Sequence, residues 1–363
     1  MAYVAVKGGQ EAIEASLKLL EYRKIEQGDQ LKISAIEANM KLLVDQVMSE
    51  ASLYAPNLAA RALWQAEGSV EEAVFLLRAY RSTLERMGYS EIIDTSNEMQ
   101  VQRRISAAFK DIPGGQMLGA TYDYMHRLID FSDENEHREQ VKQLLAEFRP
   151  QETEMKNAEI GKYEKVSAYL QDQGILNRLP ENNTEPEDMT KKVLEFPTKR
   201  SERLQILSRG MAQSLMAFAY SIIRGYGDAH PTVGELRVGT VPVYYAEEQQ
   251  SEAAYYLGKI EMTEAEMYIP KTIKKNGKEE MEIEIGYGFV YGRNETKAIS
   301  MGILDYSLEE GNKELPTGDE EFVLYHIDSI ESTGFLSHLK LPHYVTFQSK
   351  LDSIRKTQER GEE

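Results

Sequence analysis

The chain has 363 residues, a formal net charge of -18 and no cysteine. Its length favours two or three domains, and its acidity argues against a chain that coats nucleic acid or an anionic membrane, because both need clustered positive charge. The lack of cysteine excludes a disulfide framework, a thiolate nucleophile and an iron-sulfur cluster held by this chain alone. A metal would therefore rest on histidine and carboxylate.

The N-terminus lacks the basic start, apolar core and small-residue cleavage site of a secretory signal. The best apolar run, Met211 to Ile223, falls short of the roughly 20 residues that span a bilayer. We therefore expect a soluble, cytoplasmic protein that binds neither membrane nor nucleic acid.

Residues 1–94 predict a helical N-terminal domain. Helical periodicity begins at Gln10, and Ser34 to Glu37 fits a capping box that opens a second helix. A third helix begins near Pro56, and Ser69 to Glu72 caps a fourth. Short links between these amphipathic segments indicate an all-α region.

A basic run joined to a glycine-rich loop opens the second predicted region. Arg103 and Arg104 precede a loop that contains Lys110 and a Pro-Gly-Gly sequence. Free N–H groups at Gly114 and Gly115 could hold phosphate oxygens that the cations neutralise. The Gly-Lys-Ser/Thr ending of a P-loop is absent, and the alternative is a tight turn.

Strongly charged sequence follows this loop. Residues 133–174 predict two surface helices with a break at Pro150, and the acidic, proline-containing stretch 179–188 predicts an exposed linker. The glycine-rich loop, these helices and the linker together make up the predicted region 95–195.

The last predicted region, 196–363, begins with the densest basic patch of the chain, from Lys199 to Arg209. On a helix, Arg200 and Arg203 would share one side. This patch is either an anion site or a solvated helix face. The apolar run after it predicts a helix buried nearly all round, which ends at Arg224-Gly-Tyr-Gly, where the backbone must turn sharply.

The rest of the chain predicts a sheet. Strands are expected between residues 233 and 269, and Asn276-Gly277 is typical of a two-residue hairpin turn. We interpret 286–292 as a glycine-aromatic turn, 321–327 as a further strand and the C-terminus as an amphipathic helix. The predicted class is α+β, with a helical N-terminal region, a helical middle, and a mainly antiparallel C-terminal sheet with helices.

His338 and His343 lie five residues apart, with a proline directly before the second. A helical metal pair would use a spacing of three or four, so this spacing indicates imidazoles offered from an irregular segment. Two imidazoles make half of a tetrahedral zinc site. The alternative is two polar residues in a loop that leads into the last helix.

Several motifs along the chain resemble one protein family. They are Tyr3-Val-Ala-Val-Lys-Gly-Gly9, Phe75-Leu-Leu-Arg-Ala-Tyr-Arg81, Arg103-Arg-Ile-Ser106, Lys110-Asp-Ile-Pro-Gly-Gly-Gln116, Thr121-Tyr-Asp-Tyr124, Arg224-Gly-Tyr-Gly227, Asp319-Glu-Glu-Phe-Val-Leu324 and Ser337-His-Leu-Lys-Leu-Pro-His-Tyr344. Together they resemble the I-subunit family of the bacterial carbon-phosphorus lyase core complex. The resemblance is weakest between Asp133 and Leu194.

This resemblance implies a subunit that works with G, H and J subunits and, transiently, with an ATPase-like L subunit. Members of the family take part in making α-D-ribose 1-methylphosphonate 5-triphosphate from MgATP and methylphosphonate, with adenine displaced from C1′. The isolated I subunit is associated with a purine nucleosidase activity. The resemblance also implies that His338 and His343 bind zinc, with further ligands from the J subunit.

Breaking an N-glycosidic bond needs a carboxylate near C1′ and an acid for the departing base, by analogy with sugar hydrolysis. We assign these roles to Asp123 and His126, which lie inside or beside matched motifs. The triphosphate needs cationic and N–H donors. We assign it to Lys110, Gly114, Gly115, Arg200, Arg203 and Arg224.

Two other functions stay open beside this glycosyl-transfer subunit. One is a non-catalytic scaffold that contributes half of an interfacial zinc site. The other is a stand-alone nucleotide-binding protein.

Overall fold

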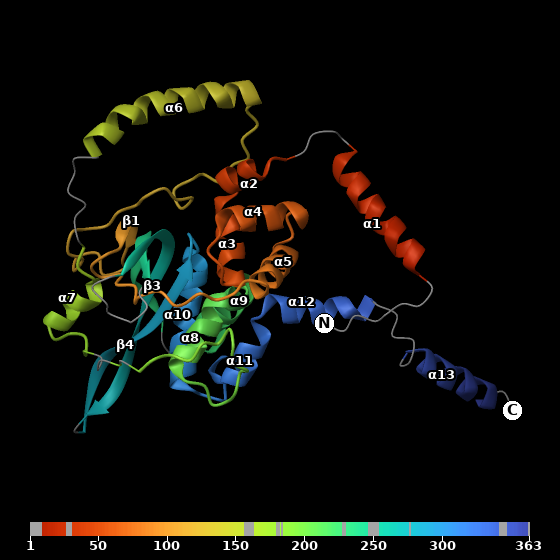
Figure 1. Cartoon of the computed structure of the whole chain (residues 1–363). Helices are drawn as coiled ribbons and strands as arrows, with labels where there is room; N and C mark the ends of the chain where they lie inside the picture. Colours follow the sequence, from red (N-terminus) through yellow and green to blue (C-terminus); the bar gives the residue numbers. More distant parts are fainter. Residues whose placement is uncertain are drawn as a thin grey trace.

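The computed structural model of the protein describes residues 9–26, 31–155, 163–178, 182, 184–226, 230–245, 254–275, 277–340 and 347–361. Helices dominate the N-terminal part, and a four-stranded antiparallel sheet with helices follows in the C-terminal part (Figure 1). This confirms the predicted α+β class. Among the described residues, no helix is long and apolar enough to cross a membrane.

Four short helices form a helical bundle near the N-terminus. They are α2 (Ile33–Asn39), α3 (Lys41–Ala51), α4 (Pro56–Gln65) and α5 (Val70–Ser82). Val47, Met48 and Leu63 lie in their shared apolar core. The predicted cap at Ser69 is confirmed, since its side chain accepts a hydrogen bond from the Glu72 N–H.

The capping box predicted at Ser34 is wrong. Helix α2 begins one residue earlier, at Ile33, after an extended Lys32 that provides no side-chain cap. Ser34 therefore lies inside the first turn and does not occupy the N-cap position, from which its hydroxyl could cap the helix. Met40 separates α2 from α3, so the single predicted helix is two.

The sheet consists of β1 (Gln100–Ile105), β2 (Thr232–Tyr245), β3 (Tyr255–Lys275) and β4 (Lys278–Tyr291), in that order. The predicted hairpin is confirmed, because Lys275 pairs with Lys278 across a two-residue connection. Strands were predicted between residues 233 and 269, and β3 continues beyond that range to Lys275. Strand β1, from the second predicted region, pairs with β2 from the third. The proposed domain boundaries stay predictions.

Helix α10 (Glu295–Glu310) lies across one face of the sheet, and glycines make its close approach possible. A Cβ at Gly286 would stand 1.9 Å from the Gly302 carbonyl oxygen, and one at Gly288 would stand 2.0 Å from the Ala298 carbonyl oxygen. The predicted glycine-aromatic turn at 286–292 is therefore wrong. Most of this segment is strand β4, and its glycines serve helix packing rather than chain reversal.

Further helices complete this side of the molecule: α8 (Arg200–Arg209), α9 (Ala212–Ser221), α11 (Glu320–His326) and α12 (Ser329–Ser337). The strand predicted at 321–327 is wrong. Asp319 caps α11 by accepting hydrogen bonds from two following N–H groups, which starts a helix despite the β-prone residues that follow. Helix α9 also differs from the prediction, because Met216 and Tyr220 are exposed and only one side is buried.

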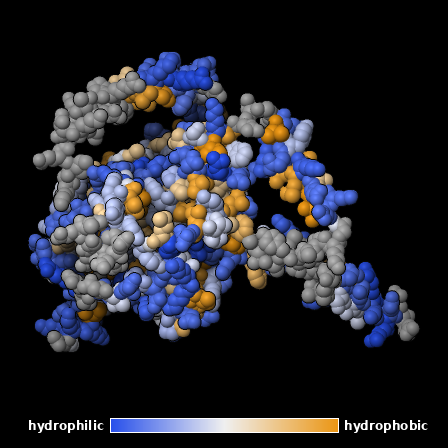
Figure 2. Space-filling model, viewed as in Figure 1, coloured by the Kyte–Doolittle hydropathy of each residue, from blue (hydrophilic) through white to orange (hydrophobic). Residues whose placement is uncertain are grey.

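Four helices lie at the periphery: α1 (Gln10–Ile25), α6 (Glu134–Met155), α7 (Val166–Asp172) and α13 (Phe347–Gly361). Helix α1 has no buried residue, and apolar patches alternate with polar ones along it (Figure 2). The break predicted at Pro150 is wrong, because α6 continues to Met155. A proline inside a helix removes one hydrogen bond and can bend the helix without ending it.

Candidate functional site

The glycine-rich loop after β1 is held by hydrogen bonds from a buried arginine. Arg104 is fully buried, and its guanidinium donates to the carbonyl oxygens of Pro113 and, at 2.6 Å, Glu164. Its Nε donates to the carboxylate of Glu235 on β2. Arg104 therefore fixes the loop in place and is not directed at an outside phosphate.

The two glycines at the loop tip have left-handed backbone conformations, with φ of +82° at Gly114 and +77° at Gly115. A Cβ at Gly114 would stand 2.8 Å from the Tyr163 ring, and the Gly115 N–H donates to the Ile112 carbonyl at 3.1 Å. Lys110 is exposed, with its ammonium 5.8 Å from the centre of the Phe109 ring. The glycines thus serve a tight turn first, whereas Lys110 faces solvent.

Asp123 is positioned by a second buried arginine. Arg103 is 4% exposed and donates to the Leu118 carbonyl oxygen and to the Asp123 carboxylate. Its Nε lies 3.0 Å from a carboxylate oxygen of Glu295, the first residue of α10. Asp123 itself is half exposed, and His126 is exposed three residues later. A fixed carboxylate and an imidazole therefore lie on one accessible loop.

Two arginines of the basic patch, Arg200 and Arg203 on α8, form ion pairs within the chain. Arg200 forms a two-pronged contact with the fully buried Asp305, at 2.6 and 3.1 Å. Arg203 pairs with Glu309 and lies 3.6 Å from Glu320. Both arginines were predicted to bind the triphosphate, but their charges are already matched by acids that follow about a hundred residues later.

The predicted phosphate contacts do not converge. The glycine-rich loop is linked to β1 by the Arg104–Met117 bridge, at one edge of the sheet, while α8 lies beside α10 and β4 at the other edge (Figure 1). Arg224 is exposed in the π-helical turn η1 (Ile222–Tyr226). Within the chain as described, one compact triphosphate site made by all six predicted residues is not seen.

The structure contains a buried charged network that the sequence interpretation missed. Arg237 on β2 lies opposite Glu264 on β3, and their charged groups are 2.7 Å apart. Lys165 reaches Glu264 at 2.7 Å and Glu266 at 3.3 Å. The α7 N–H of Val166 donates to Glu235 at 3.0 Å. We call these groups, with Arg104, the charged face of the sheet.

The pKa values of two neighbouring carboxyls on this face move apart. Burial works to raise the pKa of Glu264, but the ion pairs with Lys165 and Arg237 outweigh it and hold the pKa at about 2. Burial raises the pKa of Glu266. The available sequence signal was Glu-x-Arg on one strand and Glu-x-Glu on its neighbour, because positions two apart share a face.

A hollow of about 340 Å³ opens beside the charged face. Tyr163, which contacts Gly114, belongs both to its wall and to the packing of the glycine-rich loop. The lining residues are Ser96, Asn97, Tyr163, Glu164, Lys165 and Ala168. Among the described residues, this is where the predicted loop, buried charge and an accessible concavity come closest together.

The predicted metal pair is described only in part. His338 begins the 3-10 turn η3 (His338–Lys340) at the end of α12, and its Nδ1–H donates to the Phe335 carbonyl oxygen. A backbone contact of this kind orients the imidazole ring, as in many zinc-binding histidines. His343 lies outside the described residues. Within the described ranges, no group of three or more histidine and acidic side chains could hold a metal ion.

Comparison with known proteins gives a full-length match. Residues 2–361 match the family described as bacterial phosphonate metabolism protein (PhnI). The chain is 43% identical to the α-D-ribose 1-methylphosphonate 5-triphosphate synthase subunit PhnI of Rhizobium meliloti (strain 1021), over 98% of this chain and 94% of that protein. It is also 43% identical to the same-named subunit of Escherichia coli (strain K12), over 98% of each chain.

Proposed function

The chain belongs to the PhnI family of bacterial phosphonate metabolism proteins, and we propose that it helps to make α-D-ribose 1-methylphosphonate 5-triphosphate from MgATP and methylphosphonate. The full-length similarity to two subunits of that synthase carries the proposal. In this reaction a methylphosphonate oxygen bonds to C1′ as the bond from C1′ to adenine breaks, and adenine leaves with a proton. Water as the acceptor would give a purine nucleosidase when the subunit acts alone.

The loop after β1 supplies the groups that this substitution needs. Asp123, whose carboxylate is held by a hydrogen bond from Arg103, would stabilise positive charge that develops at C1′. His126, exposed on the same loop, would protonate the departing adenine. Lys110 and Arg224 are the better candidates for the triphosphate, because Arg200 and Arg203 are ion-paired within the chain.

We propose G, H and J subunits as stable partners and the L subunit as a transient one. His338 and His343 would hold zinc together with ligands from the J subunit, and the contact between His338 Nδ1 and the Phe335 carbonyl oxygen would orient the first of these rings. When bound there, zinc would polarise a substrate oxygen or fasten the two subunits to each other.

The test is adenine release by the chain produced together with its G, H, J and L partners. We expect chromatography to show free adenine when MgATP and methylphosphonate are supplied, and phosphorus NMR to show the new phosphonate ester. Replacing His126→Gln should slow the release by about 10²-fold or more, the usual effect of losing a general acid. Asp123→Asn should also slow it, because the fixed negative charge is lost.

Asp130→Asn is a matched control, since Asp130 is an exposed carboxylate of the same loop and accepts a hydrogen bond from the Ser132 N–H. This variant should keep the parent rate. Adenine release no faster than background, with all partners present, would overturn the proposed reaction.

The His338 geometry favours one second candidate, a scaffold that contributes half of an interfacial zinc site and no catalytic group. In that case His338→Ala should weaken assembly with the J subunit and lower the bound zinc, while adenine release by the remaining complex persists. An intact parent complex that contains no zinc would argue against the scaffold.

A further inference from the structure

Strand β3 is longer than the partner on one of its sides. It has 21 residues, whereas β4 has 14 and pairs with it only from Met262, opposite Tyr291, to Lys275. Residues 255–261 of β3 continue past the end of β4 and pair with β2 alone. One edge of this part of β3 therefore has no neighbouring strand among the described residues.

The backbone groups that face this open edge can be assigned from Glu261. Its N–H donates to the Tyr54 hydroxyl at 3.0 Å, and its carbonyl accepts from the Gly292 N–H at 2.7 Å, both on the β4 side. Because successive residues of a strand alternate, the N–H and carbonyl of Lys259 point the same way. Lys259 lies opposite Pro242, which has no N–H, as expected for a pair without mutual hydrogen bonds.

The side chains around the open edge are apolar and exposed. Tyr255, Tyr256 and Leu257 are 69%, 57% and 65% exposed. The Tyr256 ring lies 5.6 Å from that of Tyr244 on β2. We call residues 241–245 and 255–260 the aromatic arm. The β2 side of this arm is already covered, because the Glu91 N–H donates to the Tyr244 carbonyl at 2.8 Å.

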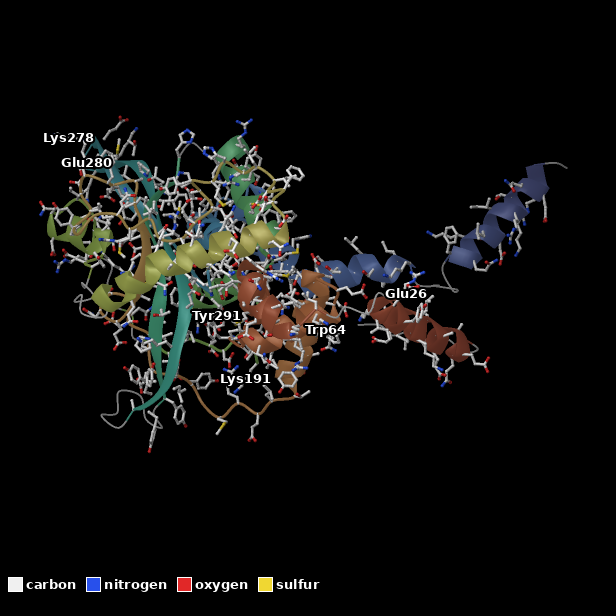
Figure 3. The ribbon with its side chains drawn as sticks, turned by 90° about the horizontal axis from the view of Figure 1, so that it is seen from above. Glu26, Trp64, Lys191, Lys278, Glu280 and Tyr291 are labelled. Carbon is white, nitrogen blue, oxygen red and sulfur yellow. The ribbon has the colours of Figure 1, made fainter. Side chains whose placement is uncertain are left out.

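The opposite end of β3 is protected in the usual way. There the β3–β4 tip carries Lys271 and Lys275, which pair with Glu284 and Glu282 at 3.4 and 3.2 Å. Charged side chains on an edge discourage further strand pairing. Figure 3 shows this tip, marked by Lys278 and Glu280, at one end of the sheet, while the aromatic arm extends beyond Tyr291 at the other.

We propose that the open edge of β3 at residues 255–260 binds an extended strand of a different subunit of the assembly. The incoming strand would pair with the N–H and carbonyl of Lys259 and place apolar side chains at alternate positions against Tyr255 and Leu257. The inference rests on the proposed function in one respect, namely that the chain works as a subunit.

A second copy of this chain fits the edge less well. The β2–β3 register shifts next to Tyr244, and Gly258 has a φ of +143°, so the edge is irregular near its middle. A two-fold pairing between copies would place both irregular strands in one short ladder. On each copy, Tyr54 and Gly292 already bond to Glu261 and prevent the ladder from extending past this residue. A regular strand from another protein meets the irregularity only once.

The test uses the full chain produced together with the other subunits of the assembly. A photo-crosslinking benzophenone amino acid in place of Tyr255 should join the chain to a different subunit. Hydrogen exchange of the outward Lys259 amide within 255–260 should slow by at least about tenfold in the complex relative to the chain alone, as expected for an amide that gains a strand hydrogen bond. Crosslinking only to a second copy, or equal exchange in both states, would overturn the proposal.

Two variants at Lys259 distinguish the contribution of its backbone N–H from that of its side chain. Lys259→Pro removes the outward N–H without breaking the β2–β3 ladder and should weaken retention of the crosslinked subunit by about tenfold, equivalent to roughly 1.4 kcal/mol. Lys259→Ala removes the same ammonium but keeps the N–H, and should retain that subunit. Loss of the subunit from both variants, or from neither, contradicts a main-chain pairing.

Glu279→Pro is the positional control, because it removes an outward N–H from the charged edge of β4 and should leave the assembly intact. Melting temperatures confirm that each variant is folded. Adenine release is measured on the same preparations. A protected edge without adenine release would reject only the proposed reaction, and adenine release with an unprotected edge would reject only the docking proposal.

Discussion

The two faces of the sheet are buried by different means. On one face, α10 covers Leu236, Ala265 and Met267, which belong to one apolar core. On the other, Arg237 and Glu264 are buried beside Lys165 under the segment that contains α7. Apolar burial gains free energy with area and tolerates small shifts. A buried ion network has a favourable free energy only when every partner is in place. The charged face therefore fixes the positions of the strands and of the segment that contains α7, and it adds little net stability.

Removing one ion from the charged face should have the largest effect. Arg237→Met leaves Glu264 buried without its closest cation on β2, which should lower the free energy of unfolding by about 3–5 kcal/mol. Urea unfolding measures the loss. The double variant with Glu264→Gln should recover part of it. If Arg237→Met alone lowers the free energy of unfolding by less than about 1 kcal/mol, the charged face does not depend on each of its ion pairs, and the contrast with the apolar face fails.

The helix on the apolar side, α10, also carries a buried amine, Lys297, and the pH dependence of stability that this amine causes tests the contrast. Lys297 is 2% exposed and donates to the Ser49 hydroxyl at 2.7 Å. Burial lowers its pKa to about 7, against the opposing effect of Glu50. Between this pKa and the unfolded value of 10.5, the unfolded state binds more protons, so stability rises with pH by up to about 1.4 kcal/mol per unit.

Lys297→Met should remove this rise and should unfold at a higher urea concentration than the parent at pH 6. Measurements from pH 6 to 10 test both points. Lys18→Met, on the exposed face of α1, is the control and should keep the parent slope. A parent protein whose stability does not change between pH 7 and 10 would contradict a neutral Lys297.

A methyl group added between α10 and the sheet should have a smaller effect. Gly288→Ala forces its Cβ against the Ala298 carbonyl and should lower the free energy of unfolding by about 1–3 kcal/mol, the usual cost of overpacking. Gly225→Ala is the control, because a Cβ there meets nothing within 4 Å. Equal stability of both variants would mean that α10 can move away freely.

An exposed cation should have the smallest effect on stability. Lys110→Ala should change the free energy of unfolding by no more than about 0.5 kcal/mol, because its ammonium is solvated. It should instead raise the KM for MgATP in adenine release. Lys313→Ala, also exposed, should change neither quantity. An unchanged KM for the first variant would remove Lys110 from the triphosphate site.

Local signals made part of the fold predictable. Three signals act within a few residues of the chain: the cap at Ser69, the proline that begins α4 and the two-residue turn between Lys275 and Lys278. The elements that they predict are present. The run at 321–327 was predicted as a strand from its β-prone residues, but the cap at Asp319 begins a helix there. Local preference was overridden there by a single side chain.

The site was harder to predict because its charges are matched over long distances in sequence. Arg200 and Asp305 are 105 positions apart, and a sequence alone cannot show that they pair. The same applies to Lys165 and Glu264, which are 99 positions apart. The histidine pair was found from its spacing, and the family resemblance added its zinc-binding role. Asp123 and His126 were chosen because they lie inside or beside motifs of that family, and all of these roles stay predictions.

The position of Arg104 has a consequence for synthesis of the chain. Its carboxylate partner Glu235 follows 131 positions later, and β1 has no strand to pair with until β2 is made. At a usual translation rate this wait lasts on the order of 10 s. During it, a guanidinium destined for the interior must stay hydrated. We therefore expect β1 and the glycine-rich loop to join the fold late, after the β2–β3–β4 meander, whose contacts are more local.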